Sequence, residues 1–492
     1  MLVRSRDSEV DYESDRHIFG CTEKYRGASK ISLLAGEQTM DSSRNDTERV
    51  ARFVAETSIE NIPKDVLTAA KTAILDCLGV ALAGSNEESA RICAEQVRTE
   101  EAHGAASVWG QGFKSSATLA ALANGTAAHA LDFDHGVYLG QPTSGVIPAV
   151  MALAEALGAS GRDLLAAYVA GFEATAKIAK SIPEEGRGGW HSAGTLGTLG
   201  ATLSCAKLLK LDIDKVRMAL GIATSMASGT ACNYGTMTKP LGAGLAARSG
   251  VMAASLAQRG FTASAKALES ATGFFGAFLS LPPDPAPLEE LGRSYELTQG
   301  LKIKPYACGG LSHNAIDAVL EMRERDGIKA DAVESIHVEV AKHAYDRLVF
   351  SVPRTGLEGK FCMGYLLARA MINGKVSLDH FTDAAVREQP MLEFAKKVHM
   401  ELNTELADSS EGRPSKVAVR LKDGKIISRY VEYSKGGPQA PLSARELRTK
   451  FVDCAHRVID EKAVQGILDC VENLESLKDV GPLCDLLVGE KR

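Results

Sequence analysis

A run of small-residue-rich helical patterns from Thr47 to Phe278 constrains the fold of this chain more than any other feature. Its segment "IPKDVLTAAKTAILDCLGVALAG" has Pro63 near a first helical turn and closes on Gly84, which is the usual start and stop chemistry of a helix. Similar patterns recur in Ser116–Ala130, Val146–Leu157, Arg162–Lys180, Gly194–Leu209, Lys215–Met226 and a last segment that ends at Gly260. Because alanine and glycine let helix backbones approach closely, these patterns predict a compact all-helical domain.

One helical segment, "GTLGTLGATLSCAKLL", also has the glycine content of a nucleotide-binding loop. Its glycines Gly194, Gly197 and Gly200 do not follow the G-x-G-x-x-G order, and no strand pattern precedes them. Close helix packing is therefore the favoured interpretation of these glycines.

The pattern changes after "LPPDPAP" at Leu281–Pro287, which we interpret as a linker. Strand patterns follow at Glu334–Ala341 and Lys416–Tyr433, and the second contains two runs that meet at Asp423-Gly424, a strong hairpin signal. Helical patterns lie among these strands, at Asn314–Arg325 and Phe361–Asn373. This part of the chain is therefore predicted to be α+β.

From Ser443 the chain is again helical, beginning with a capping box of Ser443 and Glu446. A length of 492 residues exceeds what one hydrophobic core usually serves, so we expect two domains. The predicted fold is mainly α, a large helical domain interrupted by a smaller α+β domain. Its divisions are a poorly ordered arm at 1–46, helical residues 47–278, an α+β insertion at 279–437 and helical residues 438–492.

Composition excludes several classes of protein. The apolar content of 45% and the charged content of 24% are those of a soluble globular protein. A net charge of −6 with no long basic block argues against a nucleic-acid partner. No apolar run comes close to the ~20 residues of a membrane helix, so no membrane association is expected. Acidic residues in the arm "RSRDSEVDYESDR" count against a mitochondrial transit peptide, and a cytoplasmic location is predicted.

The ten cysteines are scattered, and no two have C-x-x-C spacing. This spacing disfavours a zinc knuckle or a local iron–sulfur motif, so no metal site is predicted. Buried free thiols in a reducing compartment are the favoured interpretation.

The segment "NGTAAHALDFDHGVYLGQPTSG", Asn124–Gly145, gathers four residues that can take part in acid–base chemistry: His129, Asp132, Asp134 and His135. His129 and Asp132 are three residues apart and would share a helix face if the helix continued that far. The group is either a helix end decorated with polar residues or one wall of an acid–base site. Taken alone, the structural interpretation is favoured.

Three further segments change that balance. "RGGWHSAGT" places His191 in a glycine-rich loop before a helix, and "NYGTMTKPLGAG" places Lys239 before a proline. "LKIKPYACGGLSH" places Lys304, Tyr306 and His313 at the junction of the predicted domains. Each could be a solvated or capping group, but together they supply cations for several carboxylates and groups that move protons.

These segments resemble the MmgE/PrpD family, which includes cis-aconitate decarboxylase, 2-methylcitrate dehydratase and iminodisuccinate epimerase. "HALDFD", "GWHSAGTLG", "TKPLGAGLAARSG", "KPYACGGLSHNAIDA" and "GKFCMGYLLARAMINGKV" follow the family's order and spacing, and the resemblance runs from Thr47 to Leu487. It implies a large helical domain with a smaller α+β lid, usually as a homodimer. "WHSAGTLGTLGA" and "YACGGLSH" are more similar to the decarboxylase branch than to the dehydratase branch.

Carried over by position, the resemblance implies that five residues form the catalytic pocket between the domains: Asp132, His191, Lys239, Lys304 and Tyr365. The two lysines and His191 are expected to bind carboxylates and stabilise developing negative charge. Tyr365 and His191 are the expected proton donors, and Asp132 is expected to orient one of them. Tyr306 is added as a substrate-binding candidate.

Two positions depart from the family pattern. The family commonly has D-D-T after "DF", whereas here Asp134 is followed by His135 and Gly136. The family also has a His-Pro-Ser segment where this chain has "QPTSG", which places Gln141 at the histidine position. A glutamine cannot exchange a proton at neutral pH. Either His135 replaces the imidazole, or the reaction here differs, or His135 caps a helix and Gln141 only binds substrate.

The resemblance therefore predicts a cofactor-independent lyase that acts on a di- or tricarboxylate. The favoured activity is decarboxylation of cis-aconitate to itaconate, without a metal. Dehydration of a 2-alkylcitrate and epimerisation of a related polycarboxylate stay open as alternatives. A catalytically idle carboxylate-binding protein is the least favoured interpretation.

Overall fold

The computed structural model describes residues 44–138, 140–408 and 413–489, and these residues are mainly helical with two small sheets. The predicted arm at 1–46 lies outside the described residues except for its last three positions. The first helix, α1 (Asp46–Glu56), begins where that arm was expected to end. The predicted domain divisions stay predictions.

The helical patterns of the first half form the expected helices. They are α2 (Lys64–Gly84), α3 (Glu88–Thr99), α4 (Ala117–Ala130), α5 (Thr143–Leu157), α6 (Gly161–Lys180), α7 (Ser192–Leu208), α8 (Ile213–Met226) and α9 (Thr238–Gln258). The side chains of Ser116, Ser160 and Asp212 accept hydrogen bonds from backbone N–H groups three residues on, which fixes the starts of α4, α6 and α8.

The helix α2 corrects one expectation from the sequence. It is the one helix in the described part of the chain that is long and apolar enough to cross a membrane by length and composition. However, 67% of its most apolar stretch is buried inside the protein, as in a core helix.

The glycines of α7 lie in close helix contacts, as predicted. A Cβ atom at Gly200 would overlap the hydroxyl of Thr175 on α6, and one at Gly197 would press on Ala246 of α9. Likewise, a Cβ atom at Gly244 of α9 would overlap the backbone of α4. Small residues therefore bring α4, α6, α7 and α9 together.

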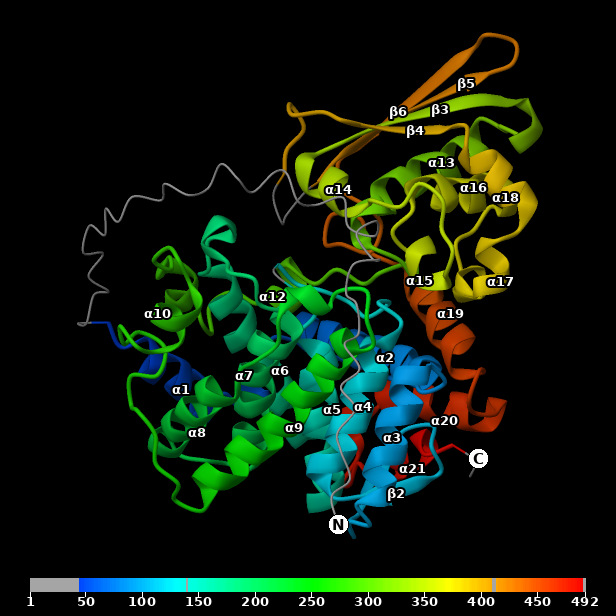
Figure 1. The fold of residues 1–492 in the computed structure, drawn as a ribbon. Coiled ribbons are helices and arrows are strands. Elements are labelled where there is room, and N and C mark those ends of the chain that lie inside the picture. The colour runs from blue at the N-terminus through cyan, green and yellow to red at the C-terminus, as the bar shows by residue number, and fades with distance from the viewer. Residues whose placement is uncertain (1–43, 139, 409–412, 490–492) are drawn as a thin grey trace, which may run out of the picture. The chain divides into compact units, whose positions relative to one another are not determined.

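The C-terminal helices complete the same hydrophobic core. They are α19 (Ala444–Ala455), α20 (Glu461–Glu472) and α21 (Gly481–Leu487), and α19 begins with the predicted capping box of Ser443 and Glu446. Phe451 on α19 and Ile467 on α20 are buried in one cluster with Ile74 of α2. Figure 1 shows α19 and α20 beside α2, at opposite ends of the colour range.

The intervening residues form a second core around a four-stranded sheet of order β4-β3-β5-β6. Its strands are β3 (Val333–Val340), β4 (Val398–Leu402), β5 (Ser415–Leu421) and β6 (Ile426–Val431). The hairpin β5–β6 is antiparallel, as predicted, and Gly424 in its turn has a φ of 87°. The strand β4, which pairs in parallel with β3, was not predicted.

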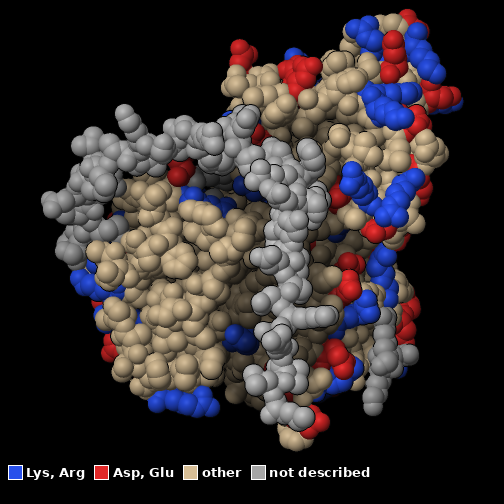
Figure 2. All heavy atoms as spheres, viewed as in Figure 1, with Lys and Arg blue, Asp and Glu red and all other residues tan. Residues whose placement is uncertain are grey.

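Helices cover one face of this sheet (Figure 1): α13 (His313–Arg325), α16 (Met363–Asn373) and α18 (Gln389–Ala395). Buried and exposed residues alternate along β3, as expected for a sheet with one covered face. Basic and acidic side chains are interspersed at this end of the chain in Figure 2, for example Lys416 paired with Glu339 at 2.9 Å.

Short elements connect these parts. They are the hairpin of β1 (Ala106–Val108) and β2 (Phe113–Ser115), and the helices α10 (Phe274–Phe278), α11 (Ala286–Glu289), α12 (Glu296–Gln299), α14 (Lys342–Arg347), α15 (Gly356–Gly359) and α17 (Asp383–Val386). The expected linker Leu281–Pro287 thus runs into a short helix, α11. The three-residue strands β1 and β2 were not predicted.

A small third cluster of buried apolar residues joins the two sides of the chain. Leu131 and Phe133, which follow α4, pack there with Ala307 and with Cys454 of α19. The turn between α4 and α5 is therefore anchored by residues from both sides of the expected linker.

Candidate active site

The site is organised around a turn at Leu131–Asp134 that follows the last residue of α4, Ala130. Asp132 has a φ of 53°, a left-handed conformation that is uncommon for residues other than glycine. The helix ends before Asp132, so the expectation that a continuing helix places His129 and Asp132 on one face is wrong. The turn instead directs the Asp132 carboxylate at two lysines.

Lys239 at the start of α9 and Lys304 converge on the carboxylate of Asp132. The Lys239 Nζ lies 2.9 Å and the Lys304 Nζ 3.3 Å from Asp132 Oδ1, and Lys304 also donates to the Asp132 carbonyl oxygen at 2.7 Å. Burial alone would raise the pKa of the Asp132 carboxyl, but the two ammonium groups hold this pKa well below its usual range. The predicted trio of Asp132, Lys239 and Lys304 is thus brought together in an ionised state.

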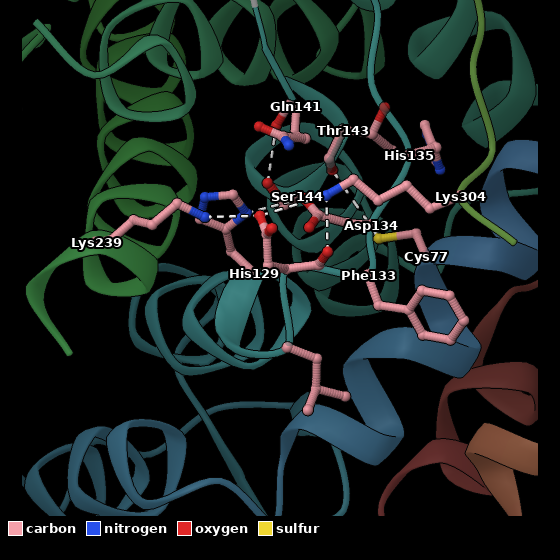
Figure 3. A network of polar contacts seen from close by, with 12 residues as sticks. Cys77, His129, Phe133, Asp134, His135, Gln141, Thr143, Ser144, Lys239 and Lys304 are labelled. Atoms are coloured by element: carbon pink, nitrogen blue, oxygen red, sulfur yellow. Dashed lines mark hydrogen bonds and ion pairs between the residues drawn. The ribbon is translucent and has the colours of Figure 1, made fainter. Parts of the chain in front are cut away.

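Two stacked histidines lie beside these charges. His129 Nδ1 is 2.9 Å from Asp134 Oδ2, and the rings of His129 and His191 stack with centroids 5.4 Å apart. Figure 3 shows Lys239 and Lys304 entering from opposite sides, with His129 and Asp134 between them. His191 is 4% exposed, and burial together with the nearby His129 and Lys239 lowers the pKa of its imidazole to about 3. His191 is therefore neutral in the free protein, and its expected role as a carboxylate-binding cation is not supported.

The edge of His191 also meets an aromatic ring from the loop before α9. The rings of His191 and Tyr234 are perpendicular, with centroids 5.3 Å apart. Tyr234 is 36% exposed, so it stands between the imidazole and solvent.

His135 lies in a different buried network and does not approach His191. Its Nδ1 is 2.8 Å from Asp76 Oδ2 on α2, and Asp76 also pairs with Lys450 of α19 at 2.5 Å. All three side chains are buried. Among the described contacts none joins His135 to the two-lysine cluster, so the hypothesis that His135 supplies the missing imidazole has no support from the geometry.

Gln141 lies next to the cluster, just before α5. Its side chain is half-buried, and its carbonyl oxygen accepts a hydrogen bond from Ser144 at 2.8 Å. Figure 3 shows Gln141 on the same side of the group as Ser144. Its expected role in substrate binding stays a prediction.

The structure does not bring Tyr365 into the cluster. Its hydroxyl donates to the carbonyl oxygen of His380 and accepts from Arg369 Nε at 2.9 Å, so it is directed into the second core rather than at the lysines. The hydroxyl of Tyr306 donates to Asp317 at 2.6 Å, and the Tyr306 ring packs on His313. The expected roles of both tyrosines stay predictions that these contacts do not support.

Within the described residues, no group of three or more His, Cys, Asp or Glu side chains is arranged to hold a metal ion. The His129–Asp134 pair is flanked by ammonium groups, which disfavour a cation there. The arrangement suits an anion.

Comparison with known proteins agrees with this chemistry. The MmgE/PrpD N-terminal domain matches residues 48–285, and the MmgE/PrpD C-terminal domain matches residues 306–476. The chain belongs to the MmgE/PrpD family.

Similar proteins of known activity are spread over animals and fungi. The chain is 28% identical to cis-aconitate decarboxylase of Mus musculus over 461 residues, which cover 90% of this chain and 93% of the mouse protein. It is 29% identical to the Homo sapiens cis-aconitate decarboxylase, with coverage of 90% and 94%. It is 28% identical to the Aspergillus terreus cis-aconitate decarboxylase, with coverage of 92% and 98%.

Several residues of the site were missed as site residues. His129 and Asp134 were noted in the sequence but not assigned a role, because their contact depends on a turn that periodicity does not predict. Lys360 was not noted at all: it is 6% exposed, and its Nζ donates to the Leu131 carbonyl oxygen. A lysine inside the apolar sequence "GKFCMGYLLARA" was the available signal.

Proposed function

We propose that this protein is a lyase of the cis-aconitate decarboxylase type, which acts on a di- or tricarboxylate. The observation that carries the proposal is the convergence of Lys239 and Lys304 on one carboxylate, that of Asp132, beside two stacked imidazoles. The names and coverage of the relatives agree with it.

In this proposal the substrate carboxylates share the two ammonium groups with Asp132. Two lysines against one aspartate leave a net positive charge at the cluster, which favours a ligand with several negative charges. The pKa of His191 is low in the free protein, and a bound polycarboxylate beside it would raise this pKa again. The imidazole would therefore become able to hold a proton only when the substrate is bound.

The chemical step follows from these charges. The bond to the departing carboxylate breaks, its electron pair stays on carbon, and CO₂ leaves. The negative charge spreads over the double bond onto a neighbouring carboxylate, where the lysines stabilise it. A proton then adds at the far end of this system, and His129, which Asp134 orients, and His191 are the candidates to deliver it. No step requires a metal or organic cofactor, and cofactor independence is part of the proposal.

A second candidate function is favoured by one observation. Gln141 stands where relatives are expected to have a histidine, and the ring of His135 is held by Asp76 instead of replacing it. A pocket with one imidazole fewer suits a changed reaction, such as the dehydration of a 2-alkylcitrate. Incubation of the purified protein with cis-aconitate and with 2-methylcitrate, followed by NMR of the products, separates these reactions. Itaconate with CO₂ supports decarboxylation, an alkene product without CO₂ supports dehydration, and no turnover of either substrate contradicts both.

We also propose that the α+β part acts as a lid and that the protein is a cytoplasmic homodimer. Support for the lid is that Lys304 and Lys360 follow the expected linker, whereas the turn that they contact precedes it. Support for a dimer is the exposure of large apolar side chains near the site, Tyr234 at 36% and Met237 at 49%. Light scattering during size-exclusion chromatography tests the dimer, and a monomer at micromolar concentration would contradict it.

A further inference from the structure

Three consecutive carbonyl oxygens of the site turn are each held by a lysine from a distant segment. The pairs are Leu131 with Lys360, Asp132 with Lys304 at 2.7 Å, and Phe133 with Lys450 at 3.0 Å. Lys304 also pairs with the Asp132 carboxylate, so it belongs to the charge cluster. Lys360 and Lys450 contact the turn only through its backbone carbonyls and, for Lys450, the Phe133 ring.

The turn needs such support because of its conformation. A left-handed φ at a residue with a side chain costs about 1–2 kcal/mol, somewhat less for aspartate, and persists when the surroundings fix it. The φ of 53° at Asp132 is what separates its carboxylate from that of Asp134, so that one meets the lysines and the other meets His129. Relaxation of this turn would move both carboxylates.

Lys450 is balanced where it lies. Its ammonium group pairs with Asp76 at 2.5 Å and stands over the Phe133 ring at 3.9 Å, and Asp76 in turn holds His135. This group therefore secures the far side of the turn with its charges compensated.

Lys360 is not balanced in the same way. It is 6% exposed, and no carboxylate among the described residues lies within ion-pair distance of its Nζ; its neighbours are the Leu131 carbonyl oxygen and the Phe381 ring at 5.6 Å. Burial lowers the pKa of its ammonium group to about 8, although Asp132 and Glu87 act in the opposite direction. A buried cation with a single hydrogen bond is costly for stability, so a function of its own would explain its presence.

We propose that Lys360 is a positioning residue, which holds the Leu131–Asp134 turn so that the Asp132 carboxylate stays between Lys239 and Lys304. The inference rests on the proposed function, because the lysine pair is what binds the substrate. Lys360 itself does not touch the reacting atoms.

The test compares Lys360→Met, which keeps the length and apolar character of the side chain, with Lys360→Arg, which keeps a charged donor. Lys435→Met is the matched control, since Lys435 is 43% exposed and pairs with Glu446 away from the turn. We expect Lys360→Met to lower kcat/KM for the active polycarboxylate by about 10- to 100-fold, mainly through KM, with no loss of thermal stability. Lys360→Arg should recover part of this loss, and Lys435→Met should match the wild type.

Hydrogen exchange of the backbone amides gives a readout that needs no substrate. We expect faster exchange at residues 131–136 in Lys360→Met and unchanged exchange in the helical core. If the wild type turns over no polycarboxylate but this local change is seen, the proposed function fails while the positioning role stands. Kinetic constants within twofold of the wild type with unchanged exchange at the turn would overturn the inference. A global loss of stability in both Lys360 variants would overturn it as well, because it would show a merely structural role.

Discussion

Removal of the Lys239 ammonium group tests the charge cluster most directly. In Lys239→Met, Asp132 keeps Lys304 at 3.3 Å, so the carboxylate stays paired and the fold should be retained. The site changes from two cations against one anion to a balanced pair. A substrate carboxylate about 4 Å from an ammonium group is stabilised by roughly 4 kcal/mol at an effective dielectric constant of about 20. Release of that ammonium from Asp132 offsets part of this gain, which leaves about 2–3 kcal/mol.

This magnitude predicts a decrease in kcat/KM of roughly 30- to 150-fold, since about 1.4 kcal/mol is tenfold. The assay is steady-state kinetics on whichever tricarboxylate the wild type converts, at low ionic strength, with circular dichroism to show that the variant is folded. Lys396→Met is the control, because Lys396 is 65% exposed and pairs only with its helix neighbour Glu393. A folded Lys239→Met with kcat/KM within threefold of the wild type would refute the assignment of the two-lysine cluster as the substrate site.

The burial of Lys360 predicts a pH effect on stability. Its pKa of about 8 in the folded protein lies below the usual 10.5, so the folded state disfavours the proton, and wild-type stability should rise as pH increases from 8 to 10.5. Lys360→Met should lack this rise and, in urea unfolding at pH 7, should be up to about 3 kcal/mol more stable; equal pH profiles would contradict this. Gly244→Ala should lower the unfolding free energy by about 1–3 kcal/mol, because its Cβ would overlap the Leu122 carbonyl oxygen, and a variant as stable as the wild type would show that α9 can shift. Tyr365→Phe should cost about 1 kcal/mol of stability through the lost contacts of its hydroxyl with Arg369 and a backbone carbonyl, and leave kcat within threefold; a loss of 100-fold or more would instead restore Tyr365 as a proton donor.

Local rules were enough to predict most helices and the β5–β6 hairpin. Helix starts such as Ser116 and Ser443 satisfy backbone N–H groups with their own side chains, and this chemistry is visible in a few consecutive residues. The strand β4 was missed because its partner β3 is 65 residues away, and its own pattern of mostly exposed residues resembles a surface loop. A parallel pairing of this kind depends on tertiary structure rather than local preference.

For the site, the sequence predicted the residue types better than their partners. Asp132, Lys239 and Lys304 meet as expected. The left-handed turn at Asp132, however, decides that Asp134 rather than Asp132 binds His129, and no pattern of spacing predicts a single unusual φ. The position of Tyr365 on α16 was expected to face the cluster, but the packing of that helix directs its hydroxyl to Arg369.

The pairing of the first and last helices has a consequence for biosynthesis. Lys450 on α19 donates to the carbonyl oxygen of Phe133, 317 residues earlier in the chain. Asp76 on α2 is buried against the same lysine. A nascent chain on the ribosome therefore holds an uncompensated carboxylate and an unfinished apolar surface on α2 until α19 has emerged from the exit tunnel. During that interval the first helices are exposed to aggregation and to chaperones, and the active site cannot form before almost the whole chain has been translated.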